Sequence, residues 1–173
     1  MKTLPLPSNI SIDPASLNDV PAILTFIRGL AEYEKLSHTC VATEESLRCT
    51  LFGDRPAAEV LIARIDDTPV GFALYFQSYS TFLAKPGIYL EDLFVLPEHR
   101  GRGAGKALLV RLAQIACERN CGRLGWSVLD WNAPAIAFYE RLGATVMPDW
   151  RTCRMTEAEF GALAARGGER SGA

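Results

Sequence analysis

The sequence has no hydrophobic run long enough to cross a membrane. A membrane-spanning helix needs about 20 consecutive apolar residues, whereas the longest candidate, 70–76, has only the length of a strand. The N-terminal segment MKTLPLPSNI contains a lysine but neither a continuous apolar stretch nor a small-residue cleavage pattern, so we expect no signal peptide. These absences predict a protein without a membrane role.

A large excess of one charge is also absent. Lys and Arg number 18 and Asp and Glu number 20, which gives a formal net charge of −2 over 173 residues. Such a chain lacks the overall positive field of a nucleic-acid-binding protein, although it can still carry local basic patches. Hydrophobic residues at 49% and charged residues at 22% exclude disordered, collagen-like and coiled-coil classes. The length fits a single domain with a substantial core.

Potential metal ligands are few and scattered. The sequence has two histidines and five cysteines, the latter at Cys40, Cys49, Cys117, Cys121 and Cys153. An odd number of scattered cysteines is typical of reduced thiols in a cytoplasmic protein. Cys117 and Cys121 are four positions apart on an expected helix, but neither histidine has ligand spacing to them, so we expect no metal site. We interpret the cysteines as small buried hydrophobic residues.

Helices and strands alternate in the apolar pattern, within one predicted domain at 10–165 between flexible ends at 1–9 and 166–173. Strands are expected at 10–13, 59–65, 70–78, 87–96, 123–129, 144–147 and 151–155. Helices are expected from Ser16 to about Tyr33, after a cap at Thr43, at 103–120, at 134–142 and after a cap at Thr156. This order predicts an α/β domain with a mixed sheet.

A glycine-rich turn within 95–106 is the most informative segment. It contains, in succession, Arg100, Gly101, Arg102, Gly103, Ala104, Gly105 and Lys106. The glycines let backbone N–H groups approach an anion without Cβ obstruction, and the N-terminus of the following helix adds partial positive charge. Together with the three cations, these features predict a site for a phosphate or pyrophosphate. A turn that only reverses the chain is the alternative.

Two nucleotide-binding motifs fit this turn poorly. A P-loop requires G-x-x-x-x-G-K-[ST], and the sequence has Arg100 and Ala107 where the first glycine and the hydroxyl residue belong. A dinucleotide fingerprint requires G-x-G-x-x-G near the start of its domain. Here the glycine spacing differs and about 100 residues precede it, although Asp130 does end the next strand. A nicotinamide-dependent oxidoreductase therefore remains only an alternative.

The pattern Arg-x-x-Gly-x-Gly at 100–105 resembles the pyrophosphate-binding motif of the GNAT superfamily of N-acetyltransferases. The strand 89–95 before it and the block 131–139 after it match the same family, and together with 30–34 they resemble its diamine (spermidine/spermine) N-acetyltransferase branch. The resemblance extends over about 10–160. It implies a GNAT-type mixed, mostly antiparallel sheet with splayed central strands flanked by helices, acetyl-CoA as co-substrate, a primary amine of a small molecule as acceptor, and a homodimer.

The resemblance also assigns the chemistry. It implies that Tyr139 is the general acid for the departing thiolate, that Glu91 is a base acting through water, and that Asp92 attracts the cationic amine. Adjacent strand residues point to opposite faces, so the two acids share a cleft only if a bulge intervenes. The alternatives are that 138–139 are core aromatic residues and that the two acids form a structural salt bridge with an arginine.

For the cofactor, the resemblance implies that backbone N–H groups of 93–95 polarise the thioester carbonyl and pair with the pantetheine arm. Asn132 either holds the cofactor through its side-chain amide or is a turn residue before Pro134. The expected cofactor-binding residues are Leu93, Phe94, Val95, Arg100, Gly101, Arg102, Gly103, Ala104, Gly105, Lys106, Asn132 and Tyr139.

The amine pocket is expected at the end of the first helix. Residues 32–34 form a lid with an acidic lining in this interpretation, with Glu32 and Tyr33 as substrate-binding residues, together with Trp150; a solvated helix end is the alternative. Polyamine acetyltransferases of this branch carry an Asp-Pro-Trp before the central strand, but 79–83 reads YSTFL and lacks the acid. A diamine or lysine-like amino acid therefore competes with a polyamine. A protein amine as acceptor, or a non-catalytic acyl-CoA-binding module, remain alternatives.

Overall fold

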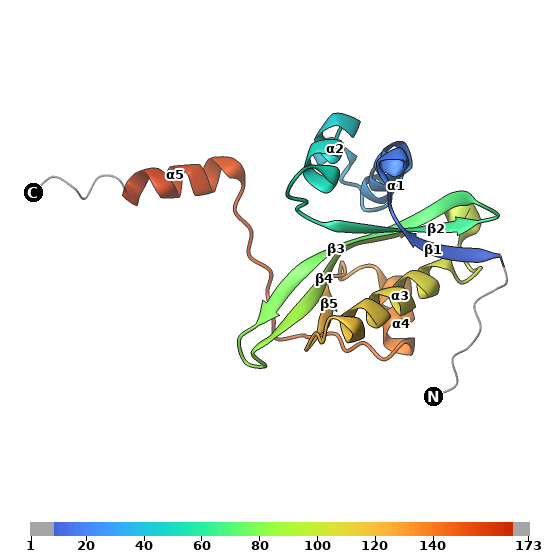
Figure 1. Ribbon diagram of the computed structural model, residues 1–173. Helices are drawn as coiled ribbons and strands as arrows, with labels where there is room; N and C mark the ends of the chain where they lie inside the picture. Colours follow the sequence, from blue (N-terminus) through green and yellow to red (C-terminus); the bar gives the residue numbers. More distant parts are fainter. Residues whose placement is uncertain (1–8, 168–173) are drawn as a thin grey trace, which may run out of the picture. The chain divides into compact units, whose positions relative to one another are not determined.

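A computed structural model describes residues 9–167, and the chain divides into two compact units at Ser127/Val128. The first unit contains β1 (Ile10–Pro14), η1 (Leu17–Asp19), α1 (Val20–Tyr33), η2 (Ser37–Thr39), α2 (Glu44–Phe52), β2 (Glu59–Ile65), β3 (Thr68–Ser80), β4 (Lys85–Val95), η3 (Pro97–His99), α3 (Ala104–Glu118) and β5 (Leu124–Trp126). The second contains α4 (Ala133–Arg141) and α5 (Glu157–Gly167). Figure 1 labels the helices and strands along the chain.

The first unit is built on one five-stranded sheet with the order β1-β2-β3-β4-β5. Strands β1 to β4 pair antiparallel with their neighbours, and β5 pairs parallel with β4. The hairpin expected between 59–65 and 70–78 is present, and β3 is longer than expected, from Thr68 to Ser80. The mixed, mostly antiparallel sheet flanked by helices is thereby confirmed.

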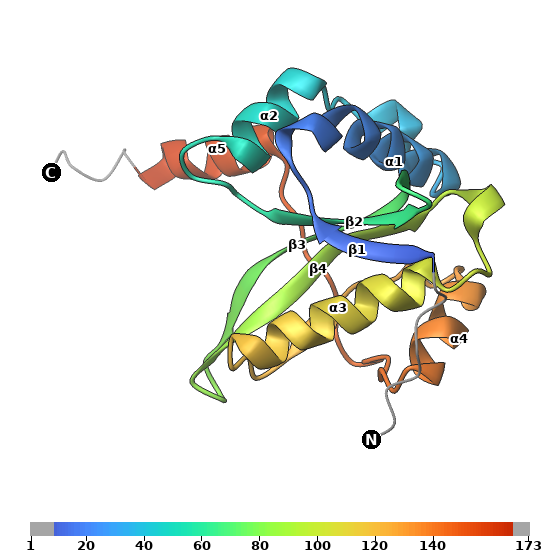
Figure 2. The same ribbon diagram turned by 45° about the vertical axis from the view of Figure 1, so that its right-hand side comes forward.

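Helices cover both faces of this sheet, with α1 and α2 on one face and α3 on the other (Figure 2). The core under α1 and α2 consists of Val20, Ile23, Leu24, Phe26, Leu47, Leu51, Val60, Ile62, Phe72 and Phe94. Helix α3 buries one stripe, made of Ala104, Ala107, Leu108, Leu109, Leu112 and Ile115, against the opposite face. The sheet is therefore apolar on both sides, which explains why charged side chains within it need a special environment.

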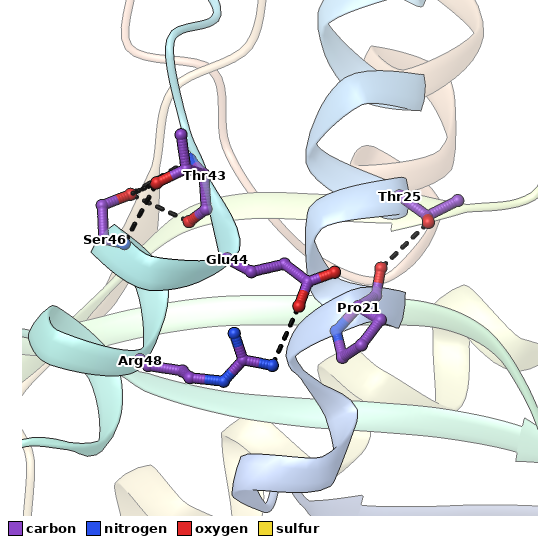
Figure 3. A network of polar contacts seen from close by, with 6 residues as sticks. All are labelled: Pro21, Thr25, Thr43, Glu44, Ser46 and Arg48. Atoms are coloured by element: carbon purple, nitrogen blue, oxygen red, sulfur yellow. Dashed lines mark hydrogen bonds and ion pairs between the residues drawn. The ribbon is translucent and has the colours of Figure 1, made fainter.

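Helix α2 begins where its cap was predicted (Figure 3). The Thr43 Oγ1 accepts a hydrogen bond from the backbone N–H of Ser46 at 3.1 Å, and the Ser46 Oγ accepts one from the backbone N–H of Thr43 at 3.1 Å. These bonds satisfy backbone donors that the first helical turn leaves without partners. The Arg48 guanidinium donates to the Glu44 carboxylate at 2.8 Å, one turn apart on the same helix.

Two predicted strands are wrong. Residues 144–147 and 151–155 form no strand, and the strand predicted at 123–129 is reduced to β5, Leu124–Trp126. A short apolar run becomes a strand only where its N–H and C=O groups meet a partner backbone, which composition alone does not supply. The first helix also begins later than predicted, at Val20, because a 3₁₀ turn follows the Ser16 cap.

The prediction of buried cysteines is also wrong in part. Cys49, Cys117 and Cys153 are exposed, and Cys40 and Cys121 are half-buried. Cys49 and Cys117 lie on α2 and α3, whose buried stripes are occupied by leucine, isoleucine and alanine. All five thiols are free. Within residues 9–167, no helix is long and apolar enough to span a membrane.

Gly29 allows α1 to lie close to β4, and its substitution tests this contact. A Cβ atom at Gly29 would lie 2.7 Å from the Phe94 Cζ, and the Phe94 ring is held in the core with 5% exposure. We predict that Gly29→Ala lowers the free energy of unfolding by about 1–2 kcal/mol, although alanine favours helix in isolation. Urea unfolding measures this change. The exposed neighbour substitution Arg28→Ala is the control, with a change within about 0.5 kcal/mol; a stabilised Gly29→Ala protein would contradict the prediction.

Candidate active site

An extra residue interrupts the pairing of β3 with β4 at the centre of the sheet. Leu74 lies opposite Asp92 and Tyr75 lies opposite Leu90, so Glu91 has no partner of its own and forms a β-bulge. Leu74 and Tyr75 point to opposite faces of the sheet, and therefore Asp92 and Leu90 do as well. The bulge breaks the strict alternation of side chains in β4. The adjacent acids Glu91 and Asp92 are therefore not required to point to opposite faces of the sheet.

The bulge places Asp92 on the face that α1 covers. Asp92 is two residues before Phe94, which belongs to the core between α1 and the sheet, and no further bulge separates them. Asp92 is half-buried there, while Glu91 is exposed. In the described part of the first unit, neither carboxylate forms an ion pair, which disfavours the alternative of a structural salt bridge with an arginine.

Burial and neighbouring negative charges change the ionisation of this site. Burial, as the largest cause, and the negative charges of Glu91 and Glu34 together raise the pKa of Asp92 to about 6. Burial also raises the pKa of Glu34. The carboxylates of Glu34, Glu91 and Asp92 therefore form one acidic cluster, and within residues 9–167 no cation forms an ion pair with any of them. A bound ammonium group would supply that cation.

Glu34 is a candidate site residue that the sequence interpretation placed only in the lid and not among the substrate-binding residues. It lies four residues after Leu30, which packs against the core, so both side chains share one face of the end of α1. Glu32 lies on the exposed side of the same turn. The spacing of four residues from Leu30, in the apolar stripe of α1, was the signal in the sequence that could have pointed to Glu34 and not to Glu32 as the residue facing the sheet.

Arg100 contacts two aromatic residues that are close in the chain to the acidic cluster. Its guanidinium carbon lies 5.0 Å from the ring centroid of Tyr33 and 5.4 Å from that of Phe94. Its Nε donates a hydrogen bond to the backbone carbonyl of Val95 at 2.9 Å. The structure therefore brings together three predicted site residues, Tyr33, Phe94 and Arg100, in one contact between α1, β4 and the glycine-rich turn.

The glycine-rich turn has the backbone conformation that an anion site requires. Gly101 and Gly103 have φ angles of 74° and 98°, in the left-handed region that favours glycine. Gly103 is the N-cap of α3, and the backbone N–H of Ala107 donates to its carbonyl at 2.9 Å. The N–H groups of 104–106 precede this first helical bond and lack helical acceptors. A Cβ at Gly101 would meet no atom within 4 Å, so the turn is open on that side.

The cations of the turn differ in their surroundings. Arg102 is exposed and Lys106 is half-buried at the first turn of α3, beside the N–H groups of that turn. A phosphate at a helix N-terminus is stabilised by both the N–H groups and the helix dipole. Residues 101–106 thus fit the pyrophosphate of acetyl-CoA by their conformation and charge.

Strand β4 also has an open edge next to this turn. Its parallel pairing with β5 covers only Ile88 to Leu90, opposite Leu124 to Trp126. Beyond Leu90, β4 continues through 91–95 with β3 as its partner in the described sheet, so backbone groups on its other side are not used by β5. Strand β5 ends at Trp126, so it leaves the backbone of Leu93 and Val95 available to pair with a ligand's amide groups.

Tyr139, Asn132 and Trp150 belong to the second unit, and their site roles remain predictions. The rings of Phe138 and Tyr139 on α4 have centroids 5.3 Å apart and an interplanar angle of 52°. Asn132 is the N-cap of α4, and its Oδ1 accepts a hydrogen bond from the N–H of Ala135 at 3.3 Å. Asn132 therefore has the capping role of the turn-residue alternative. Trp150 lies outside the helices and strands.

Comparisons with known proteins identify the family to which the chain is similar. Residues 27–144 match the acetyltransferase (GNAT) family. A thialysine N-epsilon-acetyltransferase from Bos taurus is 42% identical over 143 residues, which cover 78% of this chain and 84% of the relative. An L-ornithine N5-acetyltransferase from Arabidopsis thaliana is 35% identical over 187 residues, or 82% of each chain. A solved integron cassette protein from V. cholerae aligns with a TM-score of 0.76 at 26% identity, covering 91% of this chain and 99% of that one.

The fold is that of an acetyltransferase. It has a mixed sheet, a turn with glycines at positive φ before α3, and a central strand with a β-bulge at an acidic residue. The chain belongs to the GNAT acetyltransferase family, since the family match covers more than half of it. The resemblance stated from the sequence and the class of N-acetyltransferase are confirmed. Members of this family use acetyl-CoA as the acetyl donor. Within residues 9–167, no group of three or more His, Cys, Asp or Glu side chains could hold a metal ion.

The raised pKa of Asp92 predicts a pH-dependent stability. Its folded-state pKa of about 6 exceeds the ordinary value of 3.8, so its ionisation costs stability as the pH rises toward and above 6, and the cost vanishes below about pH 4. We predict that Asp92→Asn raises the free energy of unfolding by about 1–3 kcal/mol at pH 8 and leaves it nearly unchanged at pH 3.5. Urea unfolding at the two pH values measures the difference.

A substitution outside the site controls for the loss of one surface charge. Asp54→Asn, in the exposed loop after α2, should change the free energy of unfolding by less than about 0.5 kcal/mol at both pH values. Equal effects of Asp92→Asn at pH 8 and pH 3.5 would contradict the proposed ionisation.

Proposed function

We propose that the protein transfers the acetyl group of acetyl-CoA to a primary amine of a small molecule, either a diamine or a lysine-like diamino acid. The acidic cluster of Glu34, Glu91 and Asp92 carries this proposal, since two of its three carboxylates, those of Glu34 and Asp92, are half-buried and the cluster lies next to the open backbone of β4. An ammonium group is its natural counterion. The named activities of the two curated relatives, on thialysine and ornithine, support an acceptor with two amines.

The distribution of acids favours a short acceptor over a long polycation. Several spaced carboxylates are needed to neutralise a polyamine, whereas the acidic cluster is confined to the bulge of β4 and the end of α1. The segment 79–83, at the tip of the β3–β4 hairpin, has no acid and exposes Phe82 almost completely, at 97%. A polyamine therefore finds fewer partners here than a diamino acid or a short diamine does.

Three steps of the reaction fall to named groups in this proposal. Asp92 and Glu34 hold the ammonium, and Glu91, exposed at the bulge, takes its proton through water. The neutral amine forms a C–N bond to the thioester carbonyl while backbone N–H groups of 93–95 stabilise the charge on the carbonyl oxygen. The C–S bond breaks and Tyr139 donates its phenolic proton to the departing thiolate, while the attacking nitrogen loses its second proton, which restores the phenol of Tyr139 through solvent. No covalent enzyme intermediate is needed.

Acetyl-CoA is held in this proposal by the turn and by the open strand edge. The N–H groups of 104–106, with Arg102 and Lys106, bind the pyrophosphate. The backbone of Leu93 to Val95 pairs with the amides of the pantetheine arm as an added strand would. A homodimer is a further prediction of the family resemblance, which light scattering of the purified protein measures, and a cytoplasmic location remains the prediction made from the cysteines.

Thiol release from acetyl-CoA tests the proposed function directly. The acceptor panel is thialysine, lysine, ornithine, putrescine, spermidine and a lysine-containing peptide. We expect turnover with diamino acids or putrescine to exceed that with spermidine, because the acidic cluster is compact. Turnover of the peptide alone would favour a protein acceptor, and acetyl-CoA binding without turnover of any amine would favour a non-catalytic module.

Tyr139→Phe separates catalysis from binding in the same assay. Removing the phenolic proton should lower kcat by roughly 10²–10⁴-fold while the Kd for acetyl-CoA, measured by calorimetry, changes little. The matched control is Tyr79→Phe, which removes a hydroxyl from an exposed residue of the β3–β4 hairpin and should leave kcat unchanged. Unchanged turnover in Tyr139→Phe removes Tyr139 from the mechanism.

Glu91→Gln tests the base through the pH profile. A glutamine cannot accept the ammonium proton, so kcat/KM should fall by roughly 10²-fold near pH 7. The loss should shrink toward pH 10, where the free amine, with an ordinary pKa of about 10.4, deprotonates without help. Glu45→Gln, on the exposed surface of α2, is the control. A uniform loss at every pH would indicate a structural role for Glu91 instead.

A further inference from the structure

The position of Arg100 differs from the role that its motif suggests. The first arginine of Arg-x-x-Gly-x-Gly was expected to bind pyrophosphate together with Arg102 and Lys106. Instead its guanidinium lies over the rings of Tyr33 and Phe94, at 5.0 Å and 5.4 Å from their centroids, and its Nε donates to the Val95 carbonyl. Arg100 therefore joins the end of α1 to the end of β4.

The Phe94 ring in this stack also lies close to α1 at its tip. Gly29 faces the ring so closely that a Cβ there would lie 2.7 Å from its Cζ. Tyr33 follows Gly29 by four residues and so occupies the same side of the helix, one turn further on. The ring of Phe94 is thus in contact with Gly29 and with the guanidinium, which also covers Tyr33. The contact of Gly29 with Phe94 and the stacking of Arg100 on Tyr33 and Phe94 together hold the last turn of α1 against β4.

This contact acts on the two acids that the proposed function requires. Tyr33 is adjacent to Glu34, and Phe94 is two residues from Asp92 on the same face of β4. Glu34 and Asp92 repel each other when both are ionised, and that repulsion drives the end of α1 away from β4. The stack of Arg100 on Tyr33 and Phe94 opposes it and sets the spacing between the two carboxylates.

We propose that Arg100 is a positioning residue for the amine site, which holds Glu34 at its working distance from Asp92 through Tyr33 and Phe94, and that it is not a ligand of the cofactor pyrophosphate. This inference rests on the proposed amine acetylation. The anion is left to the N–H groups of 104–106, to Arg102 and to Lys106. A planar guanidinium can stack on two rings and donate from Nε at the same time, whereas a lysine ammonium cannot reproduce this geometry.

Comparison of Arg100→Gln with Arg102→Gln tests the assignment, since both remove one cation from the same turn. Arg100→Gln should raise the KM for the amine roughly tenfold, the worth of two cation–π contacts and a hydrogen bond, with the Kd for acetyl-CoA within about twofold of the parent. Arg102→Gln should weaken acetyl-CoA binding and leave the amine KM unchanged. Arg100→Lys should behave like Arg100→Gln, because charge alone is not sufficient.

A double-mutant cycle tests whether Arg100 acts through Tyr33. Tyr33→Leu removes the aromatic face and should raise the amine KM, while Tyr33→Phe keeps the face and should restore most of the parent value. Adding Arg100→Gln to Tyr33→Leu should have much less effect than Arg100→Gln alone. Independent, additive effects of the two substitutions would overturn the inference.

Arg64→Gln separates positioning from a general loss of stability. Arg64 forms an ion pair with the buried Asp19 at 2.5 Å, away from the site, so its substitution should lower stability without raising the amine KM. If Arg100→Gln weakens acetyl-CoA as strongly as Arg102→Gln does, with the amine KM unchanged, Arg100 is a cofactor ligand and the inference is wrong.

Hydrogen exchange tests the positioning role of Arg100 without measuring acetylation, so its outcome is independent of the proposed function. In the full-length protein with no amine present, Arg100→Gln should speed exchange of backbone N–H groups at 30–36, at the end of α1, and Arg102→Gln should not. If Arg100→Gln speeds this exchange but the parent protein acetylates no amine, the role of Arg100 in holding α1 against β4 is supported and the proposed function is rejected. Unchanged exchange at 30–36 would reject the positioning role even if the protein acetylates amines.

Discussion

One additional residue in the central strand determines the arrangement of the site. Because Glu91 has no partner on β3, the side chains of β4 change face at this point, and Asp92 turns toward α1 instead of α3. Pairing with β5 also ends at Leu90, immediately before the bulge. The acidic cluster and the open backbone edge that the proposed chemistry requires therefore arise at the same place in the strand.

A cluster of like charges at the edge of an apolar core costs stability, and the surrounding contacts must compensate for it. The pKa of Asp92 near 6 reflects that cost, since burial and the charges of Glu91 and Glu34 all favour its neutral form. The close contact of Gly29 with Phe94 and the stacked guanidinium of Arg100 hold the two elements that carry these acids. A bound ammonium group would relieve the repulsion, so the same feature that strains the free protein favours its substrate.

The sequence predicted best those features that depend on neighbouring residues. The Thr43 cap, the hairpin of β2 and β3, and the glycine turn before α3 follow from short segments, because caps and positive φ angles are local properties. The strands predicted at 144–147 and 151–155 failed because a strand exists only with a partner. The exposed cysteines show the same limit, since burial depends on which face of a helix the rest of the chain covers.

The sequence by itself thus determined the GNAT family, the order of elements as far as the helix at 133–141, and the chemical types of the candidate site residues, since these reside in motifs of adjacent residues. The tertiary structure decided which of those residues meet. It brings Glu34 close enough to Asp92 to raise its pKa, and it directs Asp92 toward α1. It also stacks Arg100 on Tyr33 and Phe94. The physical reason is that strand register and helix rotation are fixed by contacts between distant segments, and a one-residue bulge reverses the facing of every side chain beyond it.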